Sequence, residues 1–206
     1  MRRCLELAKK AEGQVSPNPM VGCVIVHNEK IIGEGYHQKY KSAHAEVNAI
    51  NNVKNKNLLK DSSLYVNLEP CTHYGNTPPC TDLIIKSNIP KVFIGSRDID
   101  PKVMQDDGIE KMIKNGITVK TKILEEECRD LNKRFFTFYE KKRPYIILKW
   151  AESKDGFIAP LNQNKPLWMS SKESKKIVHK YRGIEDAILV GRITVEKDNP
   201  CLTVRE

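Results

Sequence analysis

Apolar residues follow two alternating patterns through the first 140 positions of the chain. Short runs rich in Val, Ile and Leu predict strands on both sides of a turn at 28–30, at 63–68 and at 92–95. Apolar residues at helical spacing predict helices at 2–11, 44–53, 81–87, 108–115 and 124–136. Strands that alternate with helices are typical of an open α/β sandwich, so residues 1–140 are predicted to form one α/β domain.

The pattern changes at a basic stretch, Glu140-Lys-Lys-Arg-Pro144. This stretch predicts a linker, because proline disfavours helix at the residue before it and the charges keep the segment in water. Beyond it, residues 145–156 combine a strongly apolar run with a turn and predict a strand. Residues 141–206 are therefore predicted to be a linker and the beginning of a second domain.

A possible metal site is spread over three places in the first domain. His44 is followed by Glu46, and Cys71 and Cys80 come later. One imidazole and two thiols are the ligands of a catalytic zinc site that keeps its fourth position for water. Zinc lowers the pKa of that water to roughly 7, and Glu46 is the candidate base that handles its protons.

The predicted elements bring these residues toward one place. Residues two apart point to opposite sides of a regular helix, so His44 and Glu46 share a site only where a helix begins, and Ser42 is the expected cap of that helix. Cys71 follows a predicted strand and Cys80 precedes a predicted helix. A structural zinc site is the alternative, but such a site is closed by four ligands and has no use for the carboxylate.

These residues and their surroundings resemble the cytidine-deaminase-like superfamily. The segment Leu68-Glu-Pro-Cys-Thr-His-Tyr-Gly-Asn-Thr-Pro-Pro-Cys80 has eight residues between its cysteines. This spacing is similar to one branch, the deaminase domain of bifunctional riboflavin-biosynthesis deaminase/reductases. The segments 17–26, 33–38 and 97–101 match that branch in the same order.

The resemblance implies a fold, a reaction and a set of site residues. It implies a cytidine-deaminase-like α/β/α sandwich that hydrolyses the 2-amino group of 2,5-diamino-6-(5-phosphoribosylamino)pyrimidin-4(3H)-one. The products are ammonia and 5-amino-6-(5-phosphoribosylamino)uracil. By resemblance, His44, Cys71 and Cys80 hold zinc and Glu46 carries protons. The implied residues for binding the substrate are Asn18, His37, His73 and Asp98.

Two departures from the family pattern concern the substrate's phosphate. Asn76 stands where the family often has a lysine, which removes a cation. Asp106 and Asp107 lie where the family tends to a Gly-Arg-Gly pattern, and two acids would repel a phosphate. We therefore expect weaker phosphate contacts than in the family.

Residues 145–206 resemble the opening of the dihydrofolate-reductase-like domain of the same bifunctional enzymes. The positions that the resemblance implies for NADPH are Trp168, Thr194, Asp198 and Leu202, and those for the substrate are Arg182 and Arg205. About sixty residues are too few for a self-sufficient core of this kind. We therefore expect deamination from this chain and no turnover of the reductase step.

Composition limits the possible partners without choosing among them. Lys and Arg number 35 and Asp and Glu 26, which gives a formal charge of +9. The basic residues are scattered, so an anionic nucleotide is a better partner than nucleic acid, and no membrane partner is expected. No apolar run approaches the roughly 20 residues of a membrane span, and the N-terminus lacks a signal peptide's apolar core. We expect a cytoplasmic protein, and a homo-oligomer is a candidate state.

Two other functions remain as alternatives. One is a base deaminase acting on transfer RNA, which shares the zinc motif but needs a pocket for a flipped base and a stripe of phosphate contacts. The other is a zinc-stabilised binding module without catalysis. The four cysteines without ligand spacing are expected to be small buried hydrophobic residues; they are Cys4, Cys23, Cys128 and Cys201.

Overall fold

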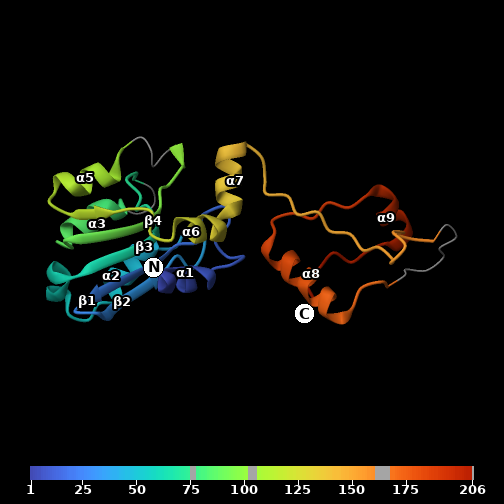
Figure 1. Cartoon of the computed structure of the whole chain (residues 1–206), viewed down its shortest axis with the longest axis horizontal. Helices are drawn as coiled ribbons and strands as arrows, with labels where there is room; N and C mark the ends of the chain where they lie inside the picture. The colour runs from blue at the N-terminus through green and yellow to red at the C-terminus, as the bar shows by residue number, and fades with distance from the viewer. Residues whose placement is uncertain (75–77, 102–105, 161–167, 206) are drawn as a thin grey trace. The chain divides into compact units, whose positions relative to one another are not determined.

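The computed structural model of the chain describes residues 1–74, 78–101, 106–160 and 168–205. The chain divides into two units, Met1–Tyr145 and Ile146–Glu206 (Figure 1). The division lies close to the predicted linker, while the function of each unit stays a prediction. Asn76 lies outside the described residues.

The first unit is built on one five-stranded sheet in the order β2-β1-β3-β4-β5. The strands are β1 (Gly22–His27), β2 (Lys30–Tyr36), β3 (Ser63–Leu68), β4 (Lys91–Ser96) and β5 (Thr118–Lys120). β1 pairs antiparallel with β2 and β3, and β4 pairs parallel with β3 and β5. The carboxyl ends of β3 and β4 therefore meet at the same edge of the sheet.

Helices cover both faces of this sheet (Figure 1). They are α1 (Arg2–Lys9), α2 (Ala45–Asn52), α3 (Cys80–Lys86), α5 (Gly108–Lys114), α6 (Glu125–Leu131) and α7 (Lys133–Lys141), with a 3-10 helix at Lys56–Asp61. The main core joins α2, α3 and α5 to alternate residues of the strands, such as Ile25 and Val66. On the opposite face, Cys4 and Leu7 of α1 pack on Val24. The predicted α/β/α sandwich is confirmed.

Two local predictions about the first unit are wrong. The single helix expected at 124–136 is two helices, α6 and α7, separated by Asn132. Its amide side chain accepts a hydrogen bond from the Met20 N–H (2.8 Å) and donates one to the Met20 carbonyl (2.9 Å). The cap of α2 is also different. Ser42 hydrogen-bonds the main chain of Lys39, and His44 occupies the N-cap position.

Glycine lets α2 approach the sheet closely. A Cβ at Gly35 would lie 2.4 Å from the Ala49 nitrogen and 2.6 Å from the Ala45 carbonyl oxygen. Both atoms belong to the main chain of α2, so a side chain at Gly35 must push the helix away from β2. The spacing of α2 from the sheet, and with it the place of His44 and Glu46, depends on this glycine.

Gly35→Ala should therefore lower the free energy of unfolding by about 3 kcal/mol. Urea denaturation of the whole chain measures this effect. Gly183→Ala is the matched control, because the nearest atom to its new Cβ lies 3.9 Å away and alanine favours a helix. Equal stability of Gly35→Ala and the unchanged chain would contradict the close packing of α2.

The second unit contains α8 (Lys172–Ile184) and α9 (Arg192–Asp198). The strand predicted within 145–156 is absent, because no strand among the described residues of this unit offers it hydrogen bonds. Its apolar side chains are exposed, with Leu148 at 79% and Trp150 at 65%. Cys201 is also exposed, against expectation. In the described parts of the chain, no helix has the length and apolar character needed to cross a membrane.

Candidate active site

Three ligand atoms from separate elements converge beside the sheet. His44 immediately precedes α2, Cys71 follows β3, and Cys80 is the first residue of α3. The His44 Nδ1 lies 3.5 Å from the Cys71 sulfur and 3.3 Å from the Cys80 sulfur. All three ligand atoms lie within 4.8 Å of one another. Tetrahedral zinc with normal bond lengths would place nitrogen and sulfur about 3.6 Å apart, so these residues fit the ion.

Proton sharing within this cluster favours a thiolate. Hydrogen bonding with the Cys80 thiol lowers the pKa of Cys71 to about 4. Hydrogen bonding with Cys71 raises the pKa of the His44 imidazole to about 9. The Cys80 main-chain N–H also donates to the Cys71 sulfur at 3.4 Å. The Cys71 thiolate is the form that binds a metal, whereas hydrogen bonding with Cys71 raises the pKa of Cys80, so binding of zinc would release the protons of His44 and Cys80.

Glu46 lies in the first turn of α2, beside this cluster and 3% exposed. Burial raises its pKa to about 7, and the negative charge of Cys71 adds to the shift. Its carboxylate does not belong to the group of possible metal ligands found among the described residues. Glu46 is therefore placed to exchange protons near neutral pH without closing the metal's fourth position.

A cavity of about 210 Å³ opens beside the cluster. The predicted residues that line it are Asn18, His37, His44, Glu46, Cys71, His73 and Asp98. Residues that the sequence did not suggest also line it, among them Glu69, Asp100 and Phe135. Glu69 precedes Pro70-Cys71 and Asp100 lies within the matched segment 97–101, so nearby motifs could have pointed to both as site residues. No motif near Phe135 pointed to the cavity.

The Asn18 and His37 side chains form one wall of the cavity. The His37 Nδ1 lies 3.1 Å from the Ala43 carbonyl, and its Nε2 lies 3.2 Å from the Asn18 amide nitrogen. Burial lowers the pKa of His37. A neutral ring that donates through Nδ1 and accepts at Nε2 satisfies both contacts. The ring therefore orients the Asn18 amide at the cavity.

His73 and Asp98 offer different chemistry to a ligand. The buried His73 Nδ1 has no hydrogen-bond partner among the described residues. Burial raises the pKa of Asp98 to about 6. One oxygen of Asp98 accepts from the Asp100 N–H at 2.8 Å, and Asp100 in turn accepts from the Tyr139 hydroxyl at 2.9 Å. The carboxyl group of Asp98 is thus held in a fixed orientation.

Comparisons with known proteins agree with this site. Residues 1–96 match the model of the cytidine and deoxycytidylate deaminase zinc-binding region, and residues 144–206 match the RibD C-terminal domain. The riboflavin biosynthesis proteins RibD of Aquifex aeolicus and Bacillus amyloliquefaciens are 49% and 45% identical to the chain. The matches cover 100% of this chain and 56% and 54% of theirs.

A solved structure from Thermotoga maritima is similar to the chain in both sequence and fold. It is a diaminohydroxyphosphoribosylaminopyrimidine deaminase/5-amino-6-(5-phosphoribosylamino)uracil reductase, 46% identical, with a TM-score of 0.91. The match covers 100% of this chain and 58% of that one. The whole chain is similar to part of each of these RibD proteins. It spans about half the length of the RibD relatives that it matches.

The match to the cytidine and deoxycytidylate deaminase zinc-binding region supports the zinc interpretation of the cluster. The matched zinc-binding region includes His44, Cys71 and Cys80. The ligand geometry and this match both identify zinc as the metal of the cluster.

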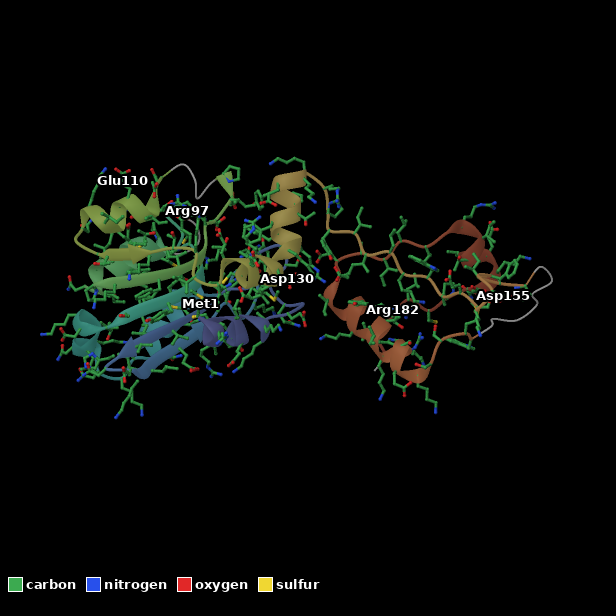
Figure 2. All side chains as sticks on the ribbon, in the orientation of Figure 1. Met1, Arg97, Glu110, Asp130, Asp155 and Arg182 are labelled. Carbon is green, nitrogen blue, oxygen red and sulfur yellow. The ribbon has the colours of Figure 1, made fainter. Side chains whose placement is uncertain are left out.

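The part that matches the RibD C-terminal domain has a cavity of its own, of about 300 Å³. Trp168, Arg182 and Arg205 line it, and Arg182 lies on α8 (Figure 2). The remaining predicted residues do not line it; they are Thr194, Asp198 and Leu202. The structure therefore brings together only three of the six residues predicted for the reductase step.

Two buried asparagines hold the wall of the deaminase-like cavity. Asn132 bonds both main-chain polar groups of Met20, and the Asn67 amide also donates to the Met20 carbonyl at 3.0 Å. Asn67 accepts from the Gly22 N–H at 2.7 Å. Asn18 stands two residues before Met20, so these amides fix the segment that presents it.

Asn132→Ala should lower the free energy of unfolding by about 2 kcal/mol. The Met20 N–H loses the partner that it has in the structure, while its carbonyl keeps Asn67. Chemical denaturation measures the loss. Asn115→Ala is a suitable control, since Asn115 bonds only the exposed end of its own helix. Unchanged stability of the Asn132 variant would show that the hydrogen bonds between Asn132 and Met20 do not stabilise the fold.

Proposed function

We propose that residues 1–140, which lie within the first unit, form a zinc-dependent deaminase of 2,5-diamino-6-(5-phosphoribosylamino)pyrimidin-4(3H)-one. The products are ammonia and 5-amino-6-(5-phosphoribosylamino)uracil. One observation carries this proposal. A buried carboxylate, Glu46, lies beside three zinc-type ligands at the end of a cavity. The printed name of the Thermotoga maritima relative supports the choice of substrate.

The residues divide the chemistry between them. His44, Cys71 and Cys80 would hold zinc, which when bound lowers the pKa of a coordinated water to roughly 7. Glu46 takes a proton from water as the water oxygen bonds to C2 of the ring, and delivers that proton to the ring nitrogen. It then takes the second proton from the new hydroxyl on C2 and delivers it to the departing amine. The C2–N bond breaks, ammonia leaves, and the ring gains a carbonyl at C2.

The walls of the cavity supply the proposed substrate contacts. The Asp98 carboxyl accepts from donor groups of the ring or ribose, and the Asn18 amide, oriented by His37, bonds a ring substituent. The unpartnered His73 Nδ1 remains for the ligand. Asp107 is less repulsive to phosphate than the sequence suggests, because it caps α5 and faces Arg97 at 3.6 Å.

The second unit is proposed to contribute to the reductase step of the same pathway. Trp168, Thr194, Asp198 and Leu202 are assigned to NADPH, and Arg182 and Arg205 to the substrate. The grouping of Trp168 and the two arginines around one cavity supports part of this assignment. A cytoplasmic location and a homo-oligomeric state are further proposals, which cell fractionation and analytical ultracentrifugation would test.

The direct test is to incubate the purified chain with the diaminopyrimidinone nucleotide and follow ammonia and the uracil product. The assay is run with and without NADPH. Ammonia released without NADPH supports the proposal, and its absence from zinc-loaded protein would refute it. Deamination of transfer RNA instead would favour the first alternative, against which the RibD C-terminal match speaks.

A further inference from the structure

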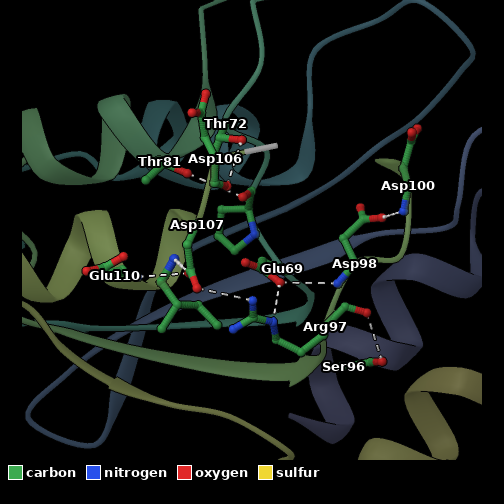
Figure 3. Close-up of polar contacts among 12 residues, drawn as sticks. Glu69, Thr72, Thr81, Ser96, Arg97, Asp98, Asp100, Asp106, Asp107 and Glu110 are labelled. Carbon is green, nitrogen blue, oxygen red and sulfur yellow. Dashed lines mark hydrogen bonds and ion pairs between the residues drawn. The ribbon is translucent and has the colours of Figure 1, made fainter. Parts of the chain in front are cut away.

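An ionic chain joins the carboxyl ends of β3 and β4 beside the cavity (Figure 3). The Arg97 Nε lies 2.9 Å from the Glu69 carboxylate, and its Nη2 lies 3.6 Å from the Asp107 carboxylate. The Glu69 side chain is only 4% exposed, whereas that of Arg97 is 47% exposed. The mechanism proposed above assigns no task to these three residues.

The Glu69 carboxylate extends the β3–β4 ladder past its regular end. The Glu69 N–H donates to the Ser96 carbonyl at 3.0 Å, as a parallel ladder requires. In a regular ladder the Asp98 N–H would then donate to the main-chain carbonyl of Glu69. It donates to the Glu69 carboxylate instead, at 3.3 Å. The side chain thereby replaces a main-chain acceptor at the point where Asp98 enters the cavity.

Arg97 also links two carboxylates near the segment that carries Asp98 and Asp100. The chain leaves the sheet at Arg97 and begins α5 after Asp107, which caps that helix through the Ile109 and Glu110 N–H groups. The Arg97 guanidinium contacts Glu69, which follows the neighbouring strand β3, and Asp107, which stands directly before α5. The planar, forked shape of arginine suits this double contact, which a single ammonium cannot reproduce.

A buried carboxylate is costly unless it is paired and hydrogen-bonded. Glu69 has both kinds of partner, the Arg97 guanidinium and the Asp98 N–H. These contacts compensate for the burial of its carboxylate beside the cavity. We propose that Glu69 and Arg97 are positioning residues that fix Asp98 for substrate binding in the deaminase site. This inference rests on the proposed function, because it gives Asp98 a substrate to bind.

The first test measures kinetics on the diaminopyrimidinone nucleotide. For Arg97→Gln we expect KM to rise about tenfold through loss of the charge-assisted contacts, with kcat and zinc content nearly unchanged. Arg97→Lys should show a smaller rise. Asp107→Asn keeps the helix cap, since asparagine caps as well as aspartate, and should raise KM about twofold.

A second test asks whether the pair acts through Asp98. Arg97→Gln is combined with Asp98→Asn, and KM of the double variant is compared with that of each single one. Residues that act through one another are not additive. The Arg97 change should therefore raise KM no further once Asp98 is replaced. A full tenfold rise in that background would overturn the proposal.

A third measurement does not depend on activity. Hydrogen exchange at the Asp98 amide should be faster in Arg97→Gln than in the unchanged chain, because the acceptor loses its anchor. Arg3→Gln is the matched control. Arg3 also contacts a carboxylate in two places, Glu34 at 3.0 and 2.7 Å, and its side chain is 42% exposed. KM and Asp98 exchange should not change in that variant.

These outcomes separate the two proposals. No ammonia from the unchanged chain would refute the deaminase function, while Asp98 exchange would still show whether the pair fixes the loop. Normal KM and normal exchange in both Arg97→Gln and Asp107→Asn would refute the positioning role and leave the deaminase function standing.

Discussion

Replacing Glu46 by Gln should lower the rate of ammonia release about 10³-fold, within the range that a positioned acid–base group contributes. The amide has nearly the same shape but cannot carry the proton from water to the leaving amine. Zinc should stay bound, because Glu46 is not among the clustered ligands. Single-turnover kinetics and metal analysis of the same preparation measure both effects.

The Glu46 variant should also be at least as stable as the unchanged chain. Burial raises the pKa of this carboxyl to about 7, which means that its charged form is disfavoured in the folded protein. A neutral amide avoids that cost. Glu126→Gln makes the same chemical change on an exposed position of α6 and should alter neither activity nor stability. Loss of zinc from Glu46→Gln would instead identify the carboxylate as a ligand.

Cys80→Ser should remove both zinc and activity. Cys80 is fully buried and its sulfur lies 3.3 Å from the His44 Nδ1, so no other described side chain can take its place without moving α3. We expect substoichiometric zinc, ammonia release below detection, and a lower melting temperature, since zinc stabilises only the folded state. Cys201→Ser, which removes an exposed thiol of the second unit, should leave zinc and activity unchanged.

Removal of zinc by a chelator should act reversibly on the unchanged chain. The first unit keeps a buried apolar core that contains no metal ligand, so it should remain folded without zinc. Activity should return when zinc is added back. Unfolding on chelation, followed by activity that never returns, would indicate a structural metal.

The residues of the metal cluster were easier to predict from the sequence than the residues that surround the cluster. His44, Cys71 and Cys80 are recognisable because metal ligands need particular atoms, and few residue types supply them. Glu46 stands out through its place two residues after His44. Strand and helix patterns then place them at element ends, which is a local property. The wrong cap at Ser42 changed nothing, because the main chain of α2 still begins beside His44.

Long-range partners decided the rest. The helical pattern runs on through Asn132, yet the helix breaks there because its amide bonds Met20, 112 residues away. The apolar run at 145–156 forms no strand, since a strand needs a neighbour to take its hydrogen bonds. Neither the long-range bond of Asn132 nor the lack of a neighbouring strand can be read from a short stretch of sequence.

The amino-acid sequence was enough to predict the kind of metal and the α/β fold, because these follow from side-chain chemistry and short-range periodicity, and its motifs carried the resemblance to the deaminases. The role of Glu46 as proton carrier stays a prediction. Only the tertiary structure decided that Glu69 and Arg97 meet beside Asp98, that Phe135 walls the cavity, and that Asn132 holds Met20. Those contacts join residues far apart along the chain, and packing of the sheet with its helices selects them.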